Sequence, residues 1–236
     1  MKIFYNLLLV ACILITQSAC SADPSIDTFQ LFILDESWYS MKLGYDAKQA
    51  TPILMNADTS DSLFVISLDD IEQYDWDTQV ITLTKEATEQ LIIALGKATH
   101  GEEVNLTNMY ADFGYGEELE LLLYTKVFIV KVNDQPLYGG IFLNSISQMA
   151  IDYPVLRITM RDNRANIAIL PVHIPFVMYD PMYSEDFTLP ETETESDAFF
   201  TNLIQNTASS ADAKSFRELI RDVRIRDLFK DVDKLR

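Results

Sequence analysis

The most distinctive chemically capable side chains are three consecutive residues, Tyr74, Asp75 and Trp76, in which two large aromatic rings flank one carboxylate. Aromatic rings beside acids can stack on a sugar or hold a cation, so these residues form a candidate site for a sugar-like or cationic ligand. Large aromatic side chains are also commonly buried. In the acidic turn that the sequence predicts at 69–77 they would then roof one end of the core, and we favour this structural interpretation.

The two histidines of the chain, His100 and His173, do not belong to a recognisable catalytic motif. Neither a Gly-x-Ser-x-Gly elbow nor a His-Glu-x-x-His helix is present in the sequence. Glycoside hydrolysis needs only two carboxylates, but the 36 acidic residues offer so many pairs that this requirement does not discriminate. We therefore assign no catalytic residue and no cofactor, and a non-enzymatic protein is the favoured expectation. The alternative is a periplasmic binder of, or hydrolase for, a sugar-like or cationic ligand at the turn formed by Tyr74, Asp75 and Trp76.

One acidic loop has some of the spacing of a calcium site. Asn56, Asp58, Ser60 and Asp61 carry oxygen ligands at nearly alternate positions. A calcium loop also needs a glycine at its tight turn and a glutamate at its twelfth position, where this chain has Ser67. A solvated loop is the expectation, and no metal ligand is assigned.

Residues 1–22 have the layout of a secretory signal peptide: Lys2, an apolar run at 7–15 and then small residues. The run is shorter than the roughly 20 apolar residues that a membrane-spanning helix needs. The alternative, an N-terminal core helix, would require a polar face that the run lacks. The sequence therefore predicts an exported protein.

The segment Gln17-Ser18-Ala19-Cys20 resembles the lipobox of bacterial lipoproteins, in which the cysteine becomes the lipidated first residue, although Gln17 stands where the family prefers an aliphatic residue. The resemblance implies lipidation at Cys20, and Ser21 after it implies the outer membrane, with the protein facing the periplasm. Cleavage after Ala22 is the alternative and would leave a soluble periplasmic protein. Cys12 lies in the discarded segment, so neither reading leaves a disulfide.

The charge balance is strongly acidic, with 36 acidic against 18 basic residues and a formal net charge of −18. Such a surface excludes nucleic acid as the expected partner. Residues 211–236 differ, because they hold eight basic and six acidic residues. The acidity belongs to the preceding globular part, where it favours solubility and could attract cations or basic partners.

The fold prediction is centred on 121–132, a strand apolar on both faces, followed by a turn at Asn133 and Asp134 and a second strand to Phe142. The pair Gly139 and Gly140 indicates a bulge or a close backbone approach. Further strands are expected at 29–34, 63–68, 80–83, 155–160 and 165–170, with a helix at 85–95 and a short one at 144–152. Residues 46–61, apart from one short extended piece at 53–55, and residues 97–116 are expected to be loops. This is an α+β fold, an antiparallel or mixed sheet with a helix on one face.

Residues 127–142, with the pattern Val-x-Val-Asn-Asp-x-x-x-Tyr-Gly-Gly, are similar to the strand-turn-strand of periplasmic domains of the SecD type. The resemblance covers a small part of the chain. It implies a shared domain shape, and it implies no translocation role, because SecD has several membrane spans that this sequence lacks.

The domain organisation predicted is a signal peptide at 1–22, an α+β domain at 23–180, an acidic linker at 181–210 and an amphipathic helical segment at 211–236. The period of this last segment breaks between Val223 and Leu228, so either one helix kinks or two helices meet. Its apolar stripe either docks on an envelope protein or packs on its own domain. The first alternative makes the chain a non-enzymatic adaptor through these residues: Phe216, Leu219, Ile220, Val223, Leu228 and Phe229.

Overall fold

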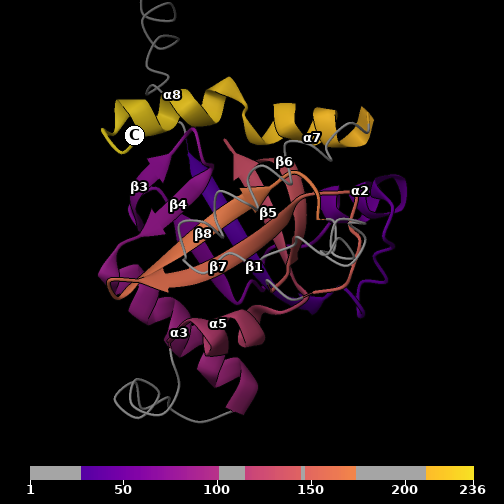
Figure 1. Ribbon diagram of the computed structural model, residues 1–236, viewed down its shortest axis with the longest axis horizontal. Coiled ribbons are helices and arrows are strands. Elements are labelled where there is room, and N and C mark those ends of the chain that lie inside the picture. Colours follow the sequence, from indigo (N-terminus) through magenta and orange to yellow (C-terminus); the bar gives the residue numbers. More distant parts are fainter. Residues whose placement is uncertain (1–27, 101–114, 145–146, 174–210) are drawn as a thin grey trace, which may run out of the picture.

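The computed structural model describes residues 28–100, 115–144, 147–173 and 211–236, and it contains one mixed sheet of eight strands in the order β2-β1-β5-β6-β7-β8-β4-β3 (Figure 1). The pair β6 and β7 is parallel and the other neighbours are antiparallel. The α+β class is confirmed. The strands are β1 (Phe29–Ser37), β2 (Phe64–Ser67), β3 (Ile71–Asp75), β4 (Val80–Leu83), β5 (Lys126–Val132), β6 (Gln135–Phe142), β7 (Val155–Arg161) and β8 (Arg164–Leu170).

The predicted central hairpin is β5 with β6. Both faces of β5 are buried, with Phe128 in the core on one side and Ile129 in the core on the other. At the turn Asn133 and Asp134 have φ of 53° and 60°, the left-handed region that Asn and Asp tolerate in a two-residue hairpin turn. Gly140 shows the close approach that was expected: a methyl group there would overlap the carbonyl oxygen of Pro154, which leads into the parallel neighbour β7.

The prediction that the central strand begins at residue 121 is wrong, because residues 121–123 belong to helix α5 (Tyr115–Leu123). Leu119 and Leu123 are buried while Leu121 is 65% exposed, which is helical rather than strand periodicity. Leucine favours helices more than the β-branched residues that follow it. The chain then turns at Thr125, whose φ is 65°, and enters β5.

Two further loop and helix predictions need correction. Helix α2 (Ala47–Met55) lies within the predicted loop 46–61, and the Asp46 carboxylate caps it by accepting a hydrogen bond of 2.6 Å from the Lys48 N–H. Pro52 is inside α2, where a proline argues against a helix, but it lies on the exposed side. In the expected helix 144–152, the described residues are not helical, and Ile151 instead forms a β-bridge with His173.

The best-defined predicted helix is α3 (Lys85–His100), which begins as expected after Thr84. The Thr84 hydroxyl accepts a hydrogen bond of 3.1 Å from the Ala87 N–H, but the helix continues past Gly96, the expected end. The remainder of the predicted loop 97–116, apart from its first and last residues, and the predicted linker 181–210 lie outside the described residues.

The sheet curls until its two edge strands are neighbours. Its end strands, β2 and β3, are consecutive in the chain and joined by the short turn 68–70, so they cannot lie a full sheet width apart. In that turn the Asp70 carboxylate accepts hydrogen bonds from the N–H and the hydroxyl of Ser67. All eight strands contribute to one inner core, for example through Phe29, Ile66, Ile71, Ile81, Phe128, Tyr138, Leu156 and Ile167.

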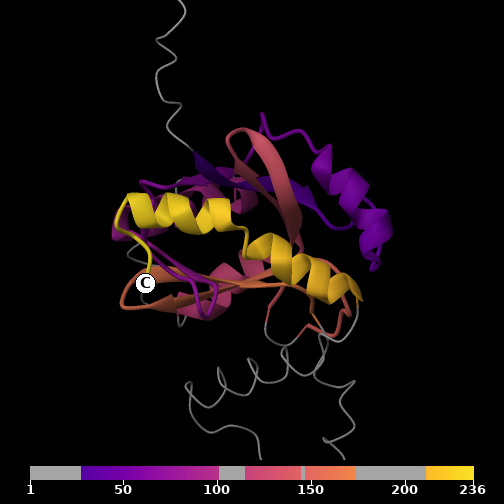
Figure 2. The same ribbon diagram turned by 90° about the horizontal axis from the view of Figure 1, so that it is seen from above.

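Helices close the two openings of the curled sheet and cover part of its outer face. Helices α3 and α5 add residues such as Leu91 and Leu123 to the inner core from one end. Helices α7 (Ala211–Ile220) and α8 (Val223–Asp231) lie at the other end, across the opening between the β1–β5 half and the β7–β8 half (Figure 2). Helix α2 covers the outer face, where Ala50 and Leu54 pack in a second core with Ile129.

The C-terminal segment consists of two helices that meet at Asp222, whose carboxylate caps α8 by accepting a hydrogen bond of 2.8 Å from the Arg224 N–H. After α8 the chain joins the free edge of β3, where the Tyr74 N–H donates to the Lys234 carbonyl and the Arg236 N–H donates to the Tyr74 carbonyl. In the stripe predicted to meet a partner, Leu219 is half-buried, Val223 is 52% exposed, and these residues are buried within their own domain: Phe216, Ile220, Leu228 and Phe229.

Replacing Phe229 by alanine should therefore destabilise the whole protein. The ring is fully buried between Phe29, at a centroid distance of 5.2 Å, and Tyr74, at 4.8 Å. Truncation of such a side chain costs about 3–5 kcal/mol, which we expect as the loss in the free energy of unfolding measured with a chemical denaturant. The control is Val223→Ala on the exposed side of the same helix, expected within about 0.5 kcal/mol of the wild type. Equal small losses would contradict the packing of α8.

Candidate functional site

Tyr74, the first residue of the predicted ligand site, is a core residue. It lies on β3 with 1% of its surface exposed, and its hydroxyl donates a hydrogen bond of 2.7 Å to Oε1 of Gln79. Its ring packs against Trp76 and Phe229. Burial raises the pKa of the Tyr74 hydroxyl, although the charge of Arg221 and the bond to Gln79 partly oppose this. The ring has no open face on which a sugar could stack.

Asp75 and Trp76, the other two residues of the predicted site, complete the turn between β3 and β4. The Asp75 carboxylate accepts hydrogen bonds of 3.0 Å from the N–H groups of Asp77 and Thr78. The Trp76 carbonyl accepts a bond of 2.6 Å from the Gln79 side chain, and the half-buried Trp76 ring packs against the inner core. Asp75 thus holds the backbone of the turn, and Trp76 covers part of the inner core.

The prediction of a turn over the whole of 69–77 is wrong, because β3 occupies most of it. The register of β3 against β4 shifts between Ile71 and Gln73. This bulge puts Tyr74 on the same buried side as Ile71, three residues away, so the period of two by which a strand is recognised is absent from the sequence.

A second group of aromatic residues, Trp38, Tyr39 and Tyr45, is exposed, and we call it the aromatic cluster. The Trp38 ring lies 4.9 Å from the Tyr39 ring, edge to face, and 5.1 Å from the Tyr45 ring. Tyr39 is 66% exposed and Tyr45 is 55% exposed, while Trp38 is half-buried. Large aromatic side chains clustered in water are unusual unless another molecule covers them.

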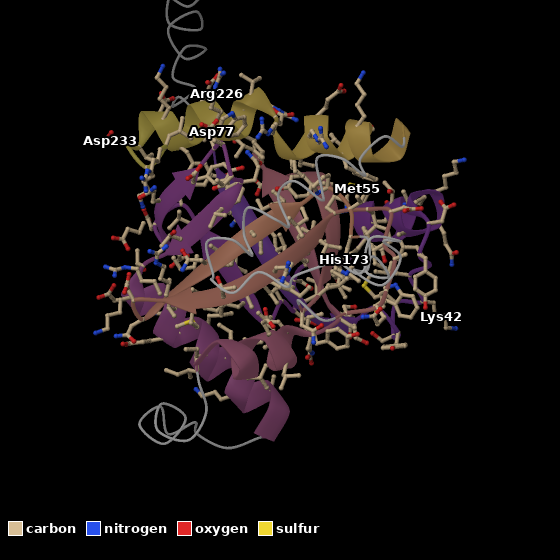
Figure 3. All side chains as sticks on the ribbon, in the orientation of Figure 1. Lys42, Met55, Asp77, His173, Arg226 and Asp233 are labelled. Atoms are coloured by element: carbon tan, nitrogen blue, oxygen red, sulfur yellow. The ribbon has the colours of Figure 1, made fainter. Side chains whose placement is uncertain are left out.

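Backbone hydrogen bonds to other parts of the domain hold the loop that carries the aromatic cluster at both of its ends. The Trp38 N–H donates a hydrogen bond of 2.8 Å to the Thr125 carbonyl, and the Asp152 N–H donates one of 3.1 Å to the Tyr45 carbonyl. Leu43, which is 2% exposed, anchors the middle of the loop, and Lys42 before it has a left-handed φ of 54°. The loop therefore holds its rings in place before any partner binds. Figure 3 shows Lys42 at the far side of the molecule from Asp77 and Asp233.

One polar group of the aromatic cluster and one of the neighbouring Tyr153 are buried. The Trp38 indole N–H and the hydroxyl of the fully buried Tyr153 have no well-aligned hydrogen bond among the described residues. The two groups are neighbours, since Trp38 partly lowers the pKa of Tyr153, which burial raises overall. A poorly satisfied polar pair costs free energy in a core. The apolar packing around Trp38 and Tyr153 in the second core must offset this cost.

His173 lies close to the strand pairing that supports this loop. Its backbone exchanges two hydrogen bonds of 2.8 Å with Ile151, and its ring Nε2 is 3.2 Å from the Ser147 carbonyl oxygen. A carbonyl only accepts, so Nε2 carries the proton in the neutral ring. Burial lowers the pKa of His173, the Ser147 bond opposes this and the charge of Arg157 adds to it. His173 thus has a structural environment and no catalytic partner set among the described residues.

From the sequence alone, five aromatic residues could extend an aromatic surface around the predicted turn if they cluster: Trp38, Tyr39, Tyr110, Phe113 and Tyr115. Tyr45 is not one of these five. Tyr110 and Phe113 lie outside the described residues, as does Cys20. The sequence does contain a weak indication of this cluster, because Tyr45 is the third aromatic residue in the short polar stretch that also holds Trp38 and Tyr39. What the sequence could not show is the bond from the distant Asp152 that fixes it.

Comparisons of this chain with protein-family models, with curated proteins and with solved structures found no match. Within the described ranges, no three His, Cys, Asp or Glu side chains are grouped so that they could hold a metal ion. No helix in the same part of the chain is long and apolar enough to cross a membrane. The candidate surface with positive structural support is the aromatic cluster, because two of its rings are mostly exposed and both pack against Trp38.

The buried neutral His173 predicts a pH dependence of stability. Its pKa is lower in the folded protein than in the unfolded chain, where it is near 6.5. Below about pH 6.5 the unfolded state therefore takes up a proton that the folded state resists, and stability is lost as the pH falls. We expect the difference in unfolding free energy between wild type and His173→Gln to shrink from pH 7.5 to pH 5.5 in denaturant titrations. A difference independent of pH would contradict a buried neutral ring.

Proposed function

We propose that this protein is an exported, non-enzymatic module of the bacterial cell envelope that binds another protein through the aromatic cluster. The observation that carries the proposal is the position of Tyr39 and Tyr45, which remain mostly exposed on a loop that backbone hydrogen bonds hold at both ends. Tyr and Trp are enriched in protein interfaces and often supply most of the binding energy.

The size of the exposed rings supports a binding role. Covering the exposed part of one tyrosine contributes on the order of 2 kcal/mol by area. A ring held in place before binding loses little conformational freedom when a partner covers it, so more of this energy becomes affinity. The C-terminal stripe is a weaker partner site than the sequence suggested, because most of its apolar side chains contact their own domain.

The proposed location rests on the N-terminal sequence. Residues 1–22 have the pattern of a signal peptide and Cys20 that of a lipid attachment site. Lipidation would make the protein an outer-membrane lipoprotein that faces the periplasm, and cleavage after Ala22 would make it soluble in the periplasm.

The partner surface can be tested by photo-crosslinking in living cells. A photoreactive amino acid at position 39 or 45 should give a discrete protein adduct, because either side chain would lie inside the interface. The matched control is position 121, since Leu121 is equally exposed, at 65%, on helix α5. Adducts of equal strength at all three positions, or none at 39 and 45, would contradict the proposal.

A sugar-like ligand is the second candidate function, and the two tryptophans allow its sites to be separated. Trp76→Phe leaves Trp38 as the fluorescent reporter of the aromatic cluster, and Trp38→Phe leaves Trp76 as the reporter of the β3–β4 turn. We expect soluble cell-wall oligosaccharides to leave the emission of both variants unchanged. A saturable change in either variant would favour sugar binding and would identify the site.

The lipid anchor is tested by metabolic labelling with a fatty-acid analogue. Wild-type protein should be labelled and should sediment with the outer membrane, while Cys20→Ser should lose both properties, because the thiol is the attachment point. Cys12→Ser is the control and should behave as the wild type. If Cys20→Ser is labelled and sediments unchanged, the protein is not a lipoprotein of this kind.

A further inference from the structure

The charge of the C-terminal helices is opposite to that of the rest of the chain. Residues 214–226, which span most of α7 and the start of α8, hold five basic and two acidic residues. The whole chain has twice as many acidic as basic residues. We call 214–226 the basic segment.

The basic segment presents three of its five basic side chains to solvent, while Arg217 is half-buried and Arg221 donates a hydrogen bond of 2.9 Å to the Asp77 carbonyl. Ile220 and Ile225 are 2% and 1% exposed. Lys214, Arg224 and Arg226 are exposed on the other side, and beside them Val223 is 52% exposed. Arg224 contacts Asp222 at 2.8 Å and Arg226 contacts Asp227 at 3.0 Å, but these pairs are at the surface and can exchange partners.

The chain enters the domain next to these helices. Phe29, the first residue of β1, packs on Phe229 of α8 at a ring distance of 5.2 Å. Cys20 precedes Thr28 by eight residues, a length that reaches at most about 28 Å when fully extended. A protein anchored at Cys20 would therefore keep α7 and α8 within reach of the membrane.

We propose that the exposed face of the basic segment binds an anionic phospholipid surface and so orients the domain on the membrane. The orienting role rests on the lipid anchor of the proposed function, but the binding itself does not. The aromatic cluster follows the far end of β1, a nine-residue strand that spans about 27 Å. Figure 3 shows Lys42, in that loop, far from Arg226 on α8. Binding by the basic segment thus leaves the aromatic cluster pointing away from the lipid.

The contact between the basic segment and an anionic membrane is weak. It can orient a domain that is already anchored, but it is too weak to recruit the protein to the membrane at physiological salt. Each basic residue near an anionic membrane adds a small increment to the binding, and the basic segment has three more basic than acidic residues. Screening over about 8 Å at physiological salt limits the repulsion from acidic residues elsewhere. Binding of the free protein is therefore weak at physiological salt and strong enough to measure at low salt, where screening is reduced. A tether raises the effective concentration and makes the contact sufficient at physiological salt.

The test uses the mature chain with Cys20→Ser, so that no lipid is attached, and vesicles of pure phosphatidylglycerol or pure phosphatidylcholine. At low salt we expect co-sedimentation to be at least tenfold stronger on phosphatidylglycerol, and the difference to vanish at high salt. The combined variant Lys214→Gln, Arg224→Gln and Arg226→Gln should lose about tenfold of this binding. It should unfold as the parent does, because Asp222 still caps α8 through the Arg224 backbone.

The matched control removes the same number of charges elsewhere, with Lys48→Gln, Lys85→Gln and Lys97→Gln, three exposed lysines on α2 and α3. It should keep the parent's binding within about twofold. Equal losses in both combined variants would show that net charge and not the basic segment matters, and would overturn the proposal. Equal sedimentation on the two lipids, or none on either, would also overturn it. Crosslinking at positions 39 and 45 is a separate readout, so either proposal can fail alone.

Discussion

The ring of Phe229 joins the two halves of the curled sheet, because it lies between Phe29 on β1 and Tyr74 on the end strand β3. Curling leaves the apolar interior of the sheet open where these halves face each other, and that opening must be covered. Helix α8 covers it, and the residues after α8 pair with the free edge of β3. The C-terminal segment is therefore part of the domain fold, and the charges on its outer side are free to serve another purpose.

This arrangement explains why the two candidate surfaces lie at different ends of the molecule. The packing of Phe229 on Phe29 places α8, which holds the C-terminal end of the basic segment, beside the start of β1. The aromatic cluster follows the end of the same strand, where bonds from Trp38 to Thr125 and from Asp152 to Tyr45 hold its loop. One strand thus separates a surface suited to lipid from a surface suited to protein.

The parts of the fold that depend on local chemistry could be predicted from sequence. The β5–β6 and β7–β8 hairpins turn at Asn133 and Asp134 and at Asp162 and Asn163, all four with positive φ, and Thr84 marks the start of α3. The parts that depend on distant contacts could not. The leucines of α5 also suit a strand, the bulge in β3 removes its alternation, and Asp46 caps a helix that Pro52 argues against. Likewise, the amphipathic pattern of the C-terminal stripe is consistent with binding a partner or with packing on its own domain. Only the three-dimensional arrangement of the sheet, which leaves an opening that these helices cover, decides between the two.

The measurement that tests closure of the sheet most directly is native-state hydrogen exchange at the Tyr74 amide. This N–H donates a bond of 2.8 Å to the Lys234 carbonyl, so with the C-terminal segment in place it exchanges only when that segment leaves the sheet. We predict that the Tyr74 amide exchanges with nearly the same opening free energy as the amides of the central strand β5, because one cooperative unit contains both. Rapid exchange of Tyr74, as at an open strand edge, while β5 stays protected would contradict this account of the fold.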